Sequence, residues 1–399
     1  MGSVTPLSFD LAMLAVRALL VAAHICLFIA VRRWLRRFGR AASTLAAAAV
    51  ALGGLALATY SELFQWNVGL FGHSDRDAGL WWILGGVWVA GSVGALLLYA
   101  AYRAATALRR GGSAASAPAG ETLPRRQVLA MAGRVALAAP YAVAGYGAFI
   151  ARRNFGLRET EMAVRNLPAD LEGLRLVQLT DLHSGPHLSL RDVEYLVDMA
   201  NETRPHVALV TGDLVTQQGD PLVGCLDRLS RLRSDAGTFG CLGNHEEYVF
   251  GSDFAEAYGR RVGLRFLRTR AELLRFGDAP LNLAGVDYQR QSEGYLEGAG
   301  SLVDPGAVNL LLSHNPDVFP RAAELGYDVT VSGHTHGGQI TVEILDQTLN
   351  AGRFFTPYVL GKYAIGDAVL YVSPGLGTVN LPIRLGVPPE VTLLRLRRA

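Results

Sequence analysis

The sequence predicts two unlike parts: an all-α membrane region over residues 1–150 and an α/β domain over residues 172–399, with residues 151–171 connecting them. Half of the 399 residues are hydrophobic, and the long apolar stretches gather before residue 150. From about residue 172, short apolar runs typical of strands alternate with amphipathic helical patterns, which indicates βαβ units. Charged residues are mixed through this second part, as in soluble α/β domains.

Four stretches of the first part are apolar and long enough to cross a bilayer, which takes about 20 residues. They run over residues 10–31, 42–61, 79–101 and 127–150. Arginine-rich loops lie at 32–40 and 102–126, whereas the loop 62–78 holds only Arg76. Because positively charged loops stay in the cytoplasm, we expect a multi-pass inner-membrane protein whose residues after 150 are extracytoplasmic.

The fourth stretch allows a second interpretation. The segment Leu123-Pro124-Arg125-Arg126-Gln127-Val128-Leu129 faintly resembles a twin-arginine export signal, and Ala142-Val143-Ala144 could be its cleavage site. We expect an uncleaved helix, and either interpretation carries the following domain across the membrane.

Other features of the composition exclude some roles. The net charge of +2 and the dispersed arginines form no nucleic-acid-binding patch. The cysteines Cys26, Cys225 and Cys241 are too few for a disulfide framework, and we expect buried thiols, with a Cys225–Cys241 disulfide left open for an extracytoplasmic domain. His24 lies inside the first apolar stretch, and the sequence offers it no partner, so we interpret it as structural.

Five predicted strands of the second part each end in side chains that are able to bind a metal. These are Asp181 and His183 after strand 174–180, Asp213 after 207–211, Asn244 and His245 after 237–242, His314 after 308–312, and His334 and His336 after 327–331. Ligands bind at the carboxyl ends of strands in α/β sheets, and carboxylate and imidazole are common metal ligands. Five coincident strand ends therefore favour one shared metal site.

The spacing of these residues suggests how they meet. Residues two apart share a face of extended backbone, so His334 and His336 are expected to reach one cleft, as are Asp181 and His183. Asp213 has two carboxylate oxygens and could bridge two cations. His245 adjoins Asn244, would point differently, and could meet the substrate.

In this order the residues resemble the five motifs of the calcineurin-like metallophosphoesterases, over residues 172–398. The motifs are Asp181-x-His183, Gly212-Asp213, Gly243-Asn244-His245-Glu246, His314 and Gly333-His334-x-His336. The run from Tyr371 to Thr378, with the later Pro382-Ile383-Arg384 and Pro388-Pro389-Glu390, is similar to the bacterial membrane-anchored (YkuE-type) branch. Glu246 stands where the family usually has aspartate, and it keeps a charge that could orient His245.

The resemblance implies a four-layer αββα sandwich with two divalent metal ions, which could be Mn, Fe, Zn or Mg. Asp181, His183, Asp213 and His336 would hold one ion, and Asp213, Asn244, His314 and His334 would hold the other, with Asp213 as the bridge. A hydroxide activated by both metals would attack phosphorus. His245 would protonate the leaving oxygen, with Glu246 supporting it.

The expected function is therefore a membrane-integral phosphoesterase that hydrolyses phosphodiesters of lipids or of the cell envelope. The segments 288–301 and 354–358 could shape its pocket, although Phe354 and Phe355 could instead belong to the core. Two alternatives remain. One is a UDP-2,3-diacylglucosamine pyrophosphohydrolase of lipid A synthesis, against which the expected location argues. The other is a non-catalytic membrane sensor or scaffold, against which the complete ligand set argues.

Overall fold

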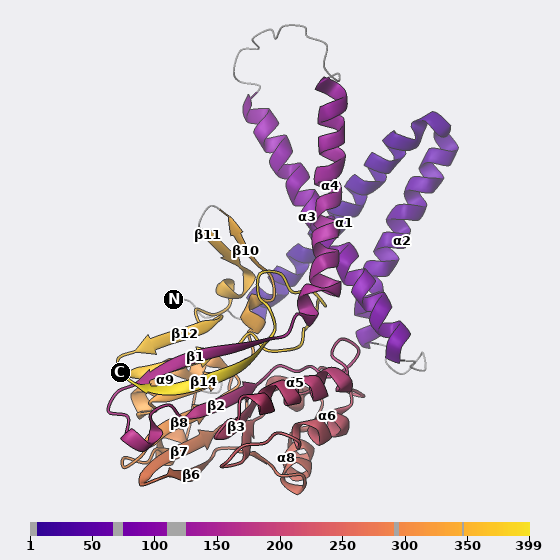
Figure 1. The fold of residues 1–399 in the computed structure, drawn as a ribbon. Helices are drawn as coiled ribbons and strands as arrows, with labels where there is room; N and C mark the ends of the chain where they lie inside the picture. Colours follow the sequence, from indigo (N-terminus) through magenta and orange to yellow (C-terminus); the bar gives the residue numbers. More distant parts are fainter. Residues whose placement is uncertain (1–5, 67–74, 110–124, 291–294, 345–346) are drawn as a thin grey trace. The chain divides into compact units, whose positions relative to one another are not determined.

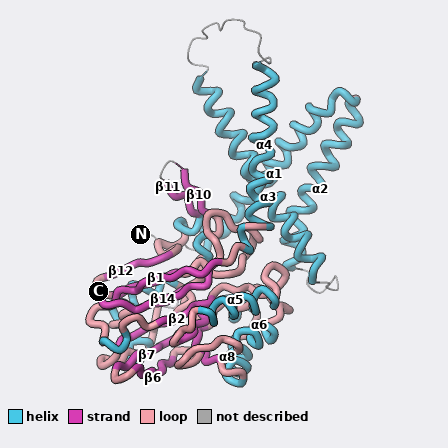
Figure 2. The backbone as a smooth tube through the Cα atoms, viewed as in Figure 1, coloured by secondary structure: helices cyan, strands magenta, loops and turns pink. Residues whose placement is uncertain are grey.

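The computed structural model describes residues 6–66, 75–109, 125–290, 295–344 and 347–399. The chain divides into two compact units, Met1–Ile150 and Ala151–Ala399. The described part of the first unit is helical, and the second combines helices with strands (Figure 2). The mixed α/β class predicted for the second part is confirmed.

The described residues of the helical unit contain fewer candidate membrane spans than the sequence predicted. Its helices are α1 (Pro6–Trp34), η1 (Leu35–Phe38), α2 (Arg40–Trp66), α3 (Asp75–Arg109) and α4 (Arg125–Phe149). Among the described residues, two stretches have the length and composition to cross a membrane, Gly79–Ala107 and Val135–Arg153, whereas Arg40–Ala56 is apolar but shorter. The four predicted spans are therefore not confirmed. Much of the predicted loops 62–78 and 102–126 lies outside the described residues.

Inside the helical unit, His24 has partners that the sequence did not reveal. The indole N–H of Trp88 on α3 donates to His24 Nε2 at 2.9 Å, and His24 Nδ1 lies 2.8 Å from the carbonyl oxygen of Leu20. Both contacts lie within the helical unit, so His24 joins α1 to α3. The interpretation of His24 as structural is consistent with these bonds.

The same helices turn large apolar side chains outward. Exposed examples are Leu19, Val21, Ile25, Leu45, Leu52, Leu80, Leu97, Val135, Val143 and Phe149. Soluble proteins rarely expose large apolar patches to water. A surface of this kind is typical of helices that face lipid.

Two six-stranded sheets form the body of the second unit. The first sheet has the order β1 (Gly156–Val164), β14 (Glu390–Arg398), β2 (Arg175–Leu179), β3 (Val207–Thr211), β4 (Thr238–Cys241) and β5 (Leu264–Phe266). The second has the order β12 (Gly361–Ile365), β13 (Ala368–Val372), β9 (Val329–Ser332), β8 (Val308–Leu312), β7 (Ala279–Gly285) and β6 (Arg270–Phe276). A separate hairpin pairs β10 (Thr341–Ile344) with β11 (Gln347–Asn350).

Helices cover the outer faces of both sheets (Figure 1). Their bounds are α5 (Leu190–Glu202), α6 (Leu222–Leu229), α7 (Asn244–Tyr248), α8 (Ser252–Arg261) and α9 (Phe319–Leu325), with 3₁₀ turns η2 (Ala151–Arg153), η3 (Ala169–Leu171), η5 (Ala299–Leu302), η6 (Pro316–Val318), η7 (His336–Gly338) and η8 (Ala351–Phe354). Alternate residues along each strand point to opposite faces. Leu176 therefore belongs to the core cluster that also contains Leu310 of the second sheet, while its neighbour Val177 belongs to the cluster that contains residues of α5 and α6.

One predicted boundary is wrong. Residues 151–171 were expected only to connect the two parts, yet β1 pairs with β14 over its full length, from Gly156 opposite Glu390 to Val164 opposite Arg398. Met162 and Val164 are fully buried in the core between the sheets. This stretch is thus an integral edge strand of the α/β unit.

The strand directions gather the candidate residues at one edge. Strands β2, β3 and β4 are parallel in the first sheet, and β8 and β9 are parallel in the second. The side-chain amide of Gln178 on β2 donates to the carbonyl oxygen of Ser332 on β9 at 3.0 Å and joins the two sheets near their carboxyl ends. The residues that follow these five strands therefore meet.

Candidate metal centre

The structure brings seven of the predicted Asp and His residues into three overlapping clusters. The clusters are Asp181–His183–His336, His183–Asp213–His245 and Asp213–His314–His334, and within each the candidate ligand atoms lie within 4.8 Å of one another. Seven of the eight predicted ligand and catalytic residues thus belong to one connected site, and the eighth, Asn244, precedes His245.

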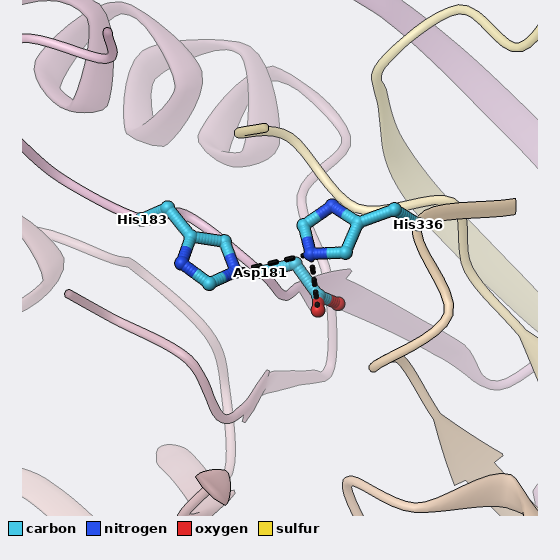
Figure 3. Close-up of side chains that lie close together, drawn as sticks. All are labelled: Asp181, His183 and His336. Carbon is cyan, nitrogen blue, oxygen red and sulfur yellow. Dashed lines mark hydrogen bonds and ion pairs between the residues drawn. The ribbon is translucent and has the colours of Figure 1, made fainter. Parts of the chain in front are cut away.

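The first cluster is compact and buried (Figure 3). The Nε2 atoms of His183 and His336 lie 3.0 Å apart, and His336 Nε2 lies 3.4 Å from Asp181 Oδ1. Two imidazole nitrogens and a carboxylate oxygen that converge in this way present their lone pairs to one point. This is a donor set that divalent cations accept.

Asp213 belongs to both the second and the third cluster. Its Oδ2 lies 3.6 Å from His183 Nε2 and 3.0 Å from His314 Nε2. Its Oδ1 accepts a hydrogen bond from the backbone N–H of His245 at 3.0 Å. The sequence analysis expected both carboxylate oxygens of Asp213 to bridge two cations. In the structure Oδ2 faces both His183 and His314, whereas Oδ1 is hydrogen-bonded to the backbone of His245.

The backbone at these residues differs from the prediction. Extended backbone was expected to aim His334 and His336 together, but their φ angles are 74° and 51°, and Asp181, His183 and Asp213 also have positive φ. Side chains rarely occupy this left-handed region, and such strain concentrates at functional sites. The two histidines therefore diverge: His336 joins the first cluster and His334 joins Asp213 and His314.

Glycines allow the loops of the two sheets to approach closely. Gly212 has φ of 90°, and a Cβ there would lie 2.6 Å from the backbone nitrogen of Gly243. At Gly333 a Cβ would lie 2.2 Å from Asp181 Oδ2. A side chain at either position would push apart the turns that carry the candidate ligands. Only glycine therefore fits at these two motif positions for steric reasons.

Hydrogen bonds on Nδ1 fix three of the histidine rings. Nδ1 of His314 lies 2.7 Å from the Thr211 carbonyl oxygen, Nδ1 of His245 lies 2.6 Å from the Thr216 carbonyl oxygen, and Nδ1 of His183 lies 3.0 Å from the Thr216 hydroxyl. A donor bond at Nδ1 leaves Nε2 with its lone pair. Thr216 carries no motif signal, and sequence reasoning missed it.

Glu246 does not orient His245, contrary to the prediction. Its buried carboxylate instead accepts from the backbone N–H groups of Asp213, Leu214 and Gly243, at 3.0, 2.7 and 2.8 Å. It thereby ties the turn after β3 to the start of α7. The role in orienting His245 belongs to Thr216.

Burial and charge set the protonation of the site. Burial lowers the pKa of His183 and of His334 to about 3 each, so both rings are neutral at pH 7. Burial raises the pKa of Asp181 to about 6. Burial also lowers the pKa of His314, but the adjacent Asp213 carboxylate outweighs this effect and raises it. Buried carboxylates beside the neutral rings of His183 and His334 favour bound cations.

Asn244 supplies a further sign of fit to a metal. It is the first residue of α7 and is buried, and its side-chain Oδ1 has no hydrogen-bond partner among the described residues. A buried acceptor normally has a partner, and a cation satisfies such an oxygen. The donor set of carboxylates, imidazoles and one amide oxygen therefore suits a two-metal centre.

A buried arginine behind the site was recognised only as part of a C-terminal pattern. Arg384 is fully buried and donates to the carbonyl oxygens of Pro374 and Gly377 at 2.7 and 2.6 Å. The backbone N–H of Gly377 in turn donates to the Asp181 carbonyl oxygen at 2.6 Å. Arg384 thus supports the loop that holds the first ligand in place.

Comparison with known proteins accounts for this arrangement. The model of the family described as calcineurin-like phosphoesterase matches residues 174–338. A metallophosphoesterase of Aquifex aeolicus is 31% identical over 263 residues, which cover 63% of this chain and 96% of the relative. The chain belongs to the calcineurin-like metallophosphoesterase family.

Two further relatives extend the similarity. The metallophosphoesterase YkuE of Bacillus subtilis is 28% identical over 288 residues, which cover 69% of this chain and 98% of the relative. A bovine transmembrane protein with a metallophosphoesterase domain is 31% identical over 258 residues, which cover 60% of this chain and 56% of the relative. The resemblance recognised from the five motifs is confirmed.

Membership establishes the general chemistry. The chain is a hydrolase of the metallophosphoesterase class, and this family uses a binuclear metal centre. The Asp and His clusters described above are able to bind metal. The comparisons favour neither the pyrophosphohydrolase nor the scaffold alternative.

Proposed function

We propose that this protein is a membrane-anchored phosphoesterase that hydrolyses phosphodiesters of lipids or of other cell-envelope molecules. The observation that carries the chemistry is the position of Asp213 Oδ2 between His183 and His314, which links two clusters of candidate ligands. Two adjacent cation sites are the arrangement used for in-line displacement at phosphorus.

The residues divide between the two ions as follows. Asp181, His183, Asp213 and His336 hold one ion, and Asp213, Asn244, His314 and His334 hold the other. Bound ions of this kind lower the pKa of water and polarise a phosphoryl oxygen. The protein contributes pre-aligned imidazoles and a shared carboxylate, so little reorganisation of the side chains is needed when the ions bind.

His245 is the proposed proton donor to the leaving oxygen. Its Nδ1 lies 2.6 Å from the Thr216 carbonyl oxygen, which can accept the Nδ1 proton and leaves Nε2 to carry the second one. The ring is only partly buried, and it lies edge-on to His183 with centroids 4.7 Å apart. It therefore lies beside the candidate ligands with access to solvent or substrate, as general acid catalysis requires.

Membrane attachment is supported by the two apolar stretches, the outward apolar side chains and the transmembrane relatives. We further propose that the α/β unit is extracytoplasmic, because arginines gather at 32–40 and 102–126. Reporter fusions within 102–126 and after Ala399 should report opposite sides of the membrane. Two cytoplasmic signals would contradict the orientation.

The catalytic proposal is tested with the full chain in detergent, loaded with Mn²⁺ and given bis(4-nitrophenyl) phosphate. We expect metal-dependent release of nitrophenolate that Asp213→Asn abolishes. Asp278→Asn is the matched control, because Asp278 is exposed and distant in sequence from every motif. Equal turnover by the two variants would contradict the assigned site.

A further inference from the structure

A short segment after the His336 motif exposes apolar side chains that the fold does not use. Leu349 at the end of β11 is 58% exposed, and Phe354 and Phe355 in and after η8 are 82% and 47% exposed. Arg353 beside them is also exposed. We call Leu349, Arg353, Phe354 and Phe355 the aromatic tip. The suggestion that Phe354 and Phe355 belong to the core is wrong.

The aromatic tip is anchored on the turn that carries a candidate ligand. The side-chain amide of Asn350 donates to the Gly337 carbonyl oxygen at 2.7 Å, and the Thr335 hydroxyl donates to the Val359 carbonyl oxygen at 2.6 Å. Both ends of the segment are thus bound to residues that flank His336. In Figure 1 the β10–β11 hairpin projects from the layered sheets.

The chain enters the α/β unit at the same edge as the site. Gly156, the first residue of β1, pairs with Glu390 at the start of β14. β14 in turn runs antiparallel to β2, and Thr392 near its start lies opposite Gln178 near the end of β2. The start of β1 therefore lies near the end of β2, where Asp181 follows. η2 is held there too, since Arg152 donates to the His187 carbonyl oxygen at 2.6 Å.

The aromatic tip and the entering strand also share one end of the two sheets. β1 is the edge strand of the first sheet and β12 is the edge strand of the second. Lys362 on β12 donates to the Glu161 carbonyl oxygen on β1 at 3.2 Å, so these edges lie together. The segment that bears the aromatic tip leads directly into β12 at Gly361, which pairs with Val372 at the end of β13.

The distance to the proposed membrane span is short. The apolar stretch ends at Arg153 and β1 begins at Gly156. Three residues reach at most about 10 Å. The start of β1, at the edge of the α/β unit that carries the site, is therefore joined to the proposed span by at most about 10 Å of chain.

We propose that the aromatic tip inserts into the headgroup–acyl boundary of the adjacent bilayer leaflet and brings the metal centre to phosphodiesters of membrane lipids. Phenylalanine and leucine gain free energy by leaving water at this boundary, while an arginine beside them contacts lipid phosphates. The inference rests on the proposed function for its substrate class. The bilayer contact can be measured without any turnover.

The direct test measures how deeply the aromatic tip enters the bilayer. Phe354→Cys is labelled with an environment-sensitive nitrobenzoxadiazole dye on the full chain in nanodiscs of phosphatidylethanolamine and phosphatidylglycerol. Phe250→Cys is the matched control, because Phe250 is 90% exposed and follows α7. The strand before α7 is β4, which lies four strands, or about 19 Å, from β1 across the sheet. The unsubstituted chain gives the background from its three native cysteines.

We expect nitroxide-bearing lipids to quench the label at position 354 while aqueous iodide does not, with the reverse at position 250. Quenching of position 354 by iodide alone would overturn the proposal, since the segment would then lie in water. Protection from both quenchers would overturn it as well, because a protein partner, such as a second copy of the chain, would cover the tip.

A kinetic test separates this proposal from the proposed function. The double variant with Phe354→Ser and Phe355→Ser should hydrolyse a soluble nitrophenyl phosphodiester at the normal rate. For the same ester with a long alkyl chain in the nanodisc, KM should rise roughly tenfold, since two apolar side chains lose their burial. Phe250→Ser should change neither rate. Equal behaviour on both esters would overturn the tip's role, whereas no hydrolysis of either ester by the unsubstituted chain would instead refute the proposed function.

Discussion

Oδ2 of Asp213 lies 3.0 Å from Nε2 of His314, and both side chains are almost fully buried. The same oxygen also faces His183, at 3.6 Å from its Nε2. A single carboxylate thus belongs to two of the three clusters of candidate ligands, and we expect both proposed metal sites to lose metal when it is changed.

Asp213→Asn tests this coupling directly. An amide has one acceptor oxygen and no negative charge, so we expect metal affinity at both sites to fall by at least about 100-fold. Elemental analysis of the purified protein should show fewer than one equivalent of metal. Two full equivalents would contradict the bridging role, and Asp278→Asn should keep both.

His336→Ala and Asn244→Ala should separate the two sites. His336 lies with Asp181 and His183, so its loss should empty mainly the first site. Asn244 follows β4 and has a buried oxygen with no hydrogen-bond partner in the described part of the chain, so its loss should empty mainly the second. Each variant should retain about one equivalent by elemental analysis. A loss of both metals in each variant would show that the sites are not independent.

His245→Gln tests the proposed acid. We expect folding and metal content to persist while turnover of an alkyl phosphodiester falls about 10²–10⁴-fold. The loss should be smaller for a nitrophenyl ester, because nitrophenolate leaves without a proton. Since His245 also lies near His183 and Asp213, loss of metal together with equal loss on both esters would identify it as a ligand instead. Glu247→Gln, on the exposed side of α7, is the control.

Glu246→Gln tests the support of the Asp213 turn. Its carboxylate accepts three backbone N–H groups with two oxygens, and an amide would place an NH₂ group against one of these donors. We expect a loss of about 1–3 kcal/mol in the free energy of unfolding, measured as a lower Tm of the metal-free protein. Glu247→Gln should change the Tm little, because Glu247 is exposed and pairs with a partly exposed Arg290. An unchanged Tm in Glu246→Gln would remove this structural role.

Removal of metal should destabilise the α/β unit. A ligand at 100 times its dissociation constant stabilises the folded state by about 2.7 kcal/mol. We expect a chelator to lower the Tm of the unsubstituted chain and to leave that of Asp213→Asn nearly unchanged. An equal decrease of Tm in both proteins would mean that the stabilising metal binds outside the proposed centre.

The sequence by itself determined the five strands that lead to the candidate site, the residues at their ends and the family. Local apolar runs define β2, β3, β4, β8 and β9, because strand burial leaves a strong periodic pattern. Motif residues that follow a strand are then placed by chain connectivity alone. The candidate metal ligands Asp181, His183, Asp213, His314, His334 and His336 could therefore be proposed without coordinates.

Only the tertiary structure decided how those residues meet. Positive φ angles separate His334 from His336, and no periodic pattern encodes a single left-handed residue. The backbone carbonyl oxygen of Thr216 lies against His245, and Arg384 donates to the backbone carbonyl oxygen of Gly377. Every residue has a backbone carbonyl group, so the sequence does not show which of them make such contacts. β1 pairs with a strand more than 200 residues later, and its exposed edge residues hide its strand character. Contacts between residues distant in the chain depend on the packing of whole sheets, and the local sequence contains no record of them.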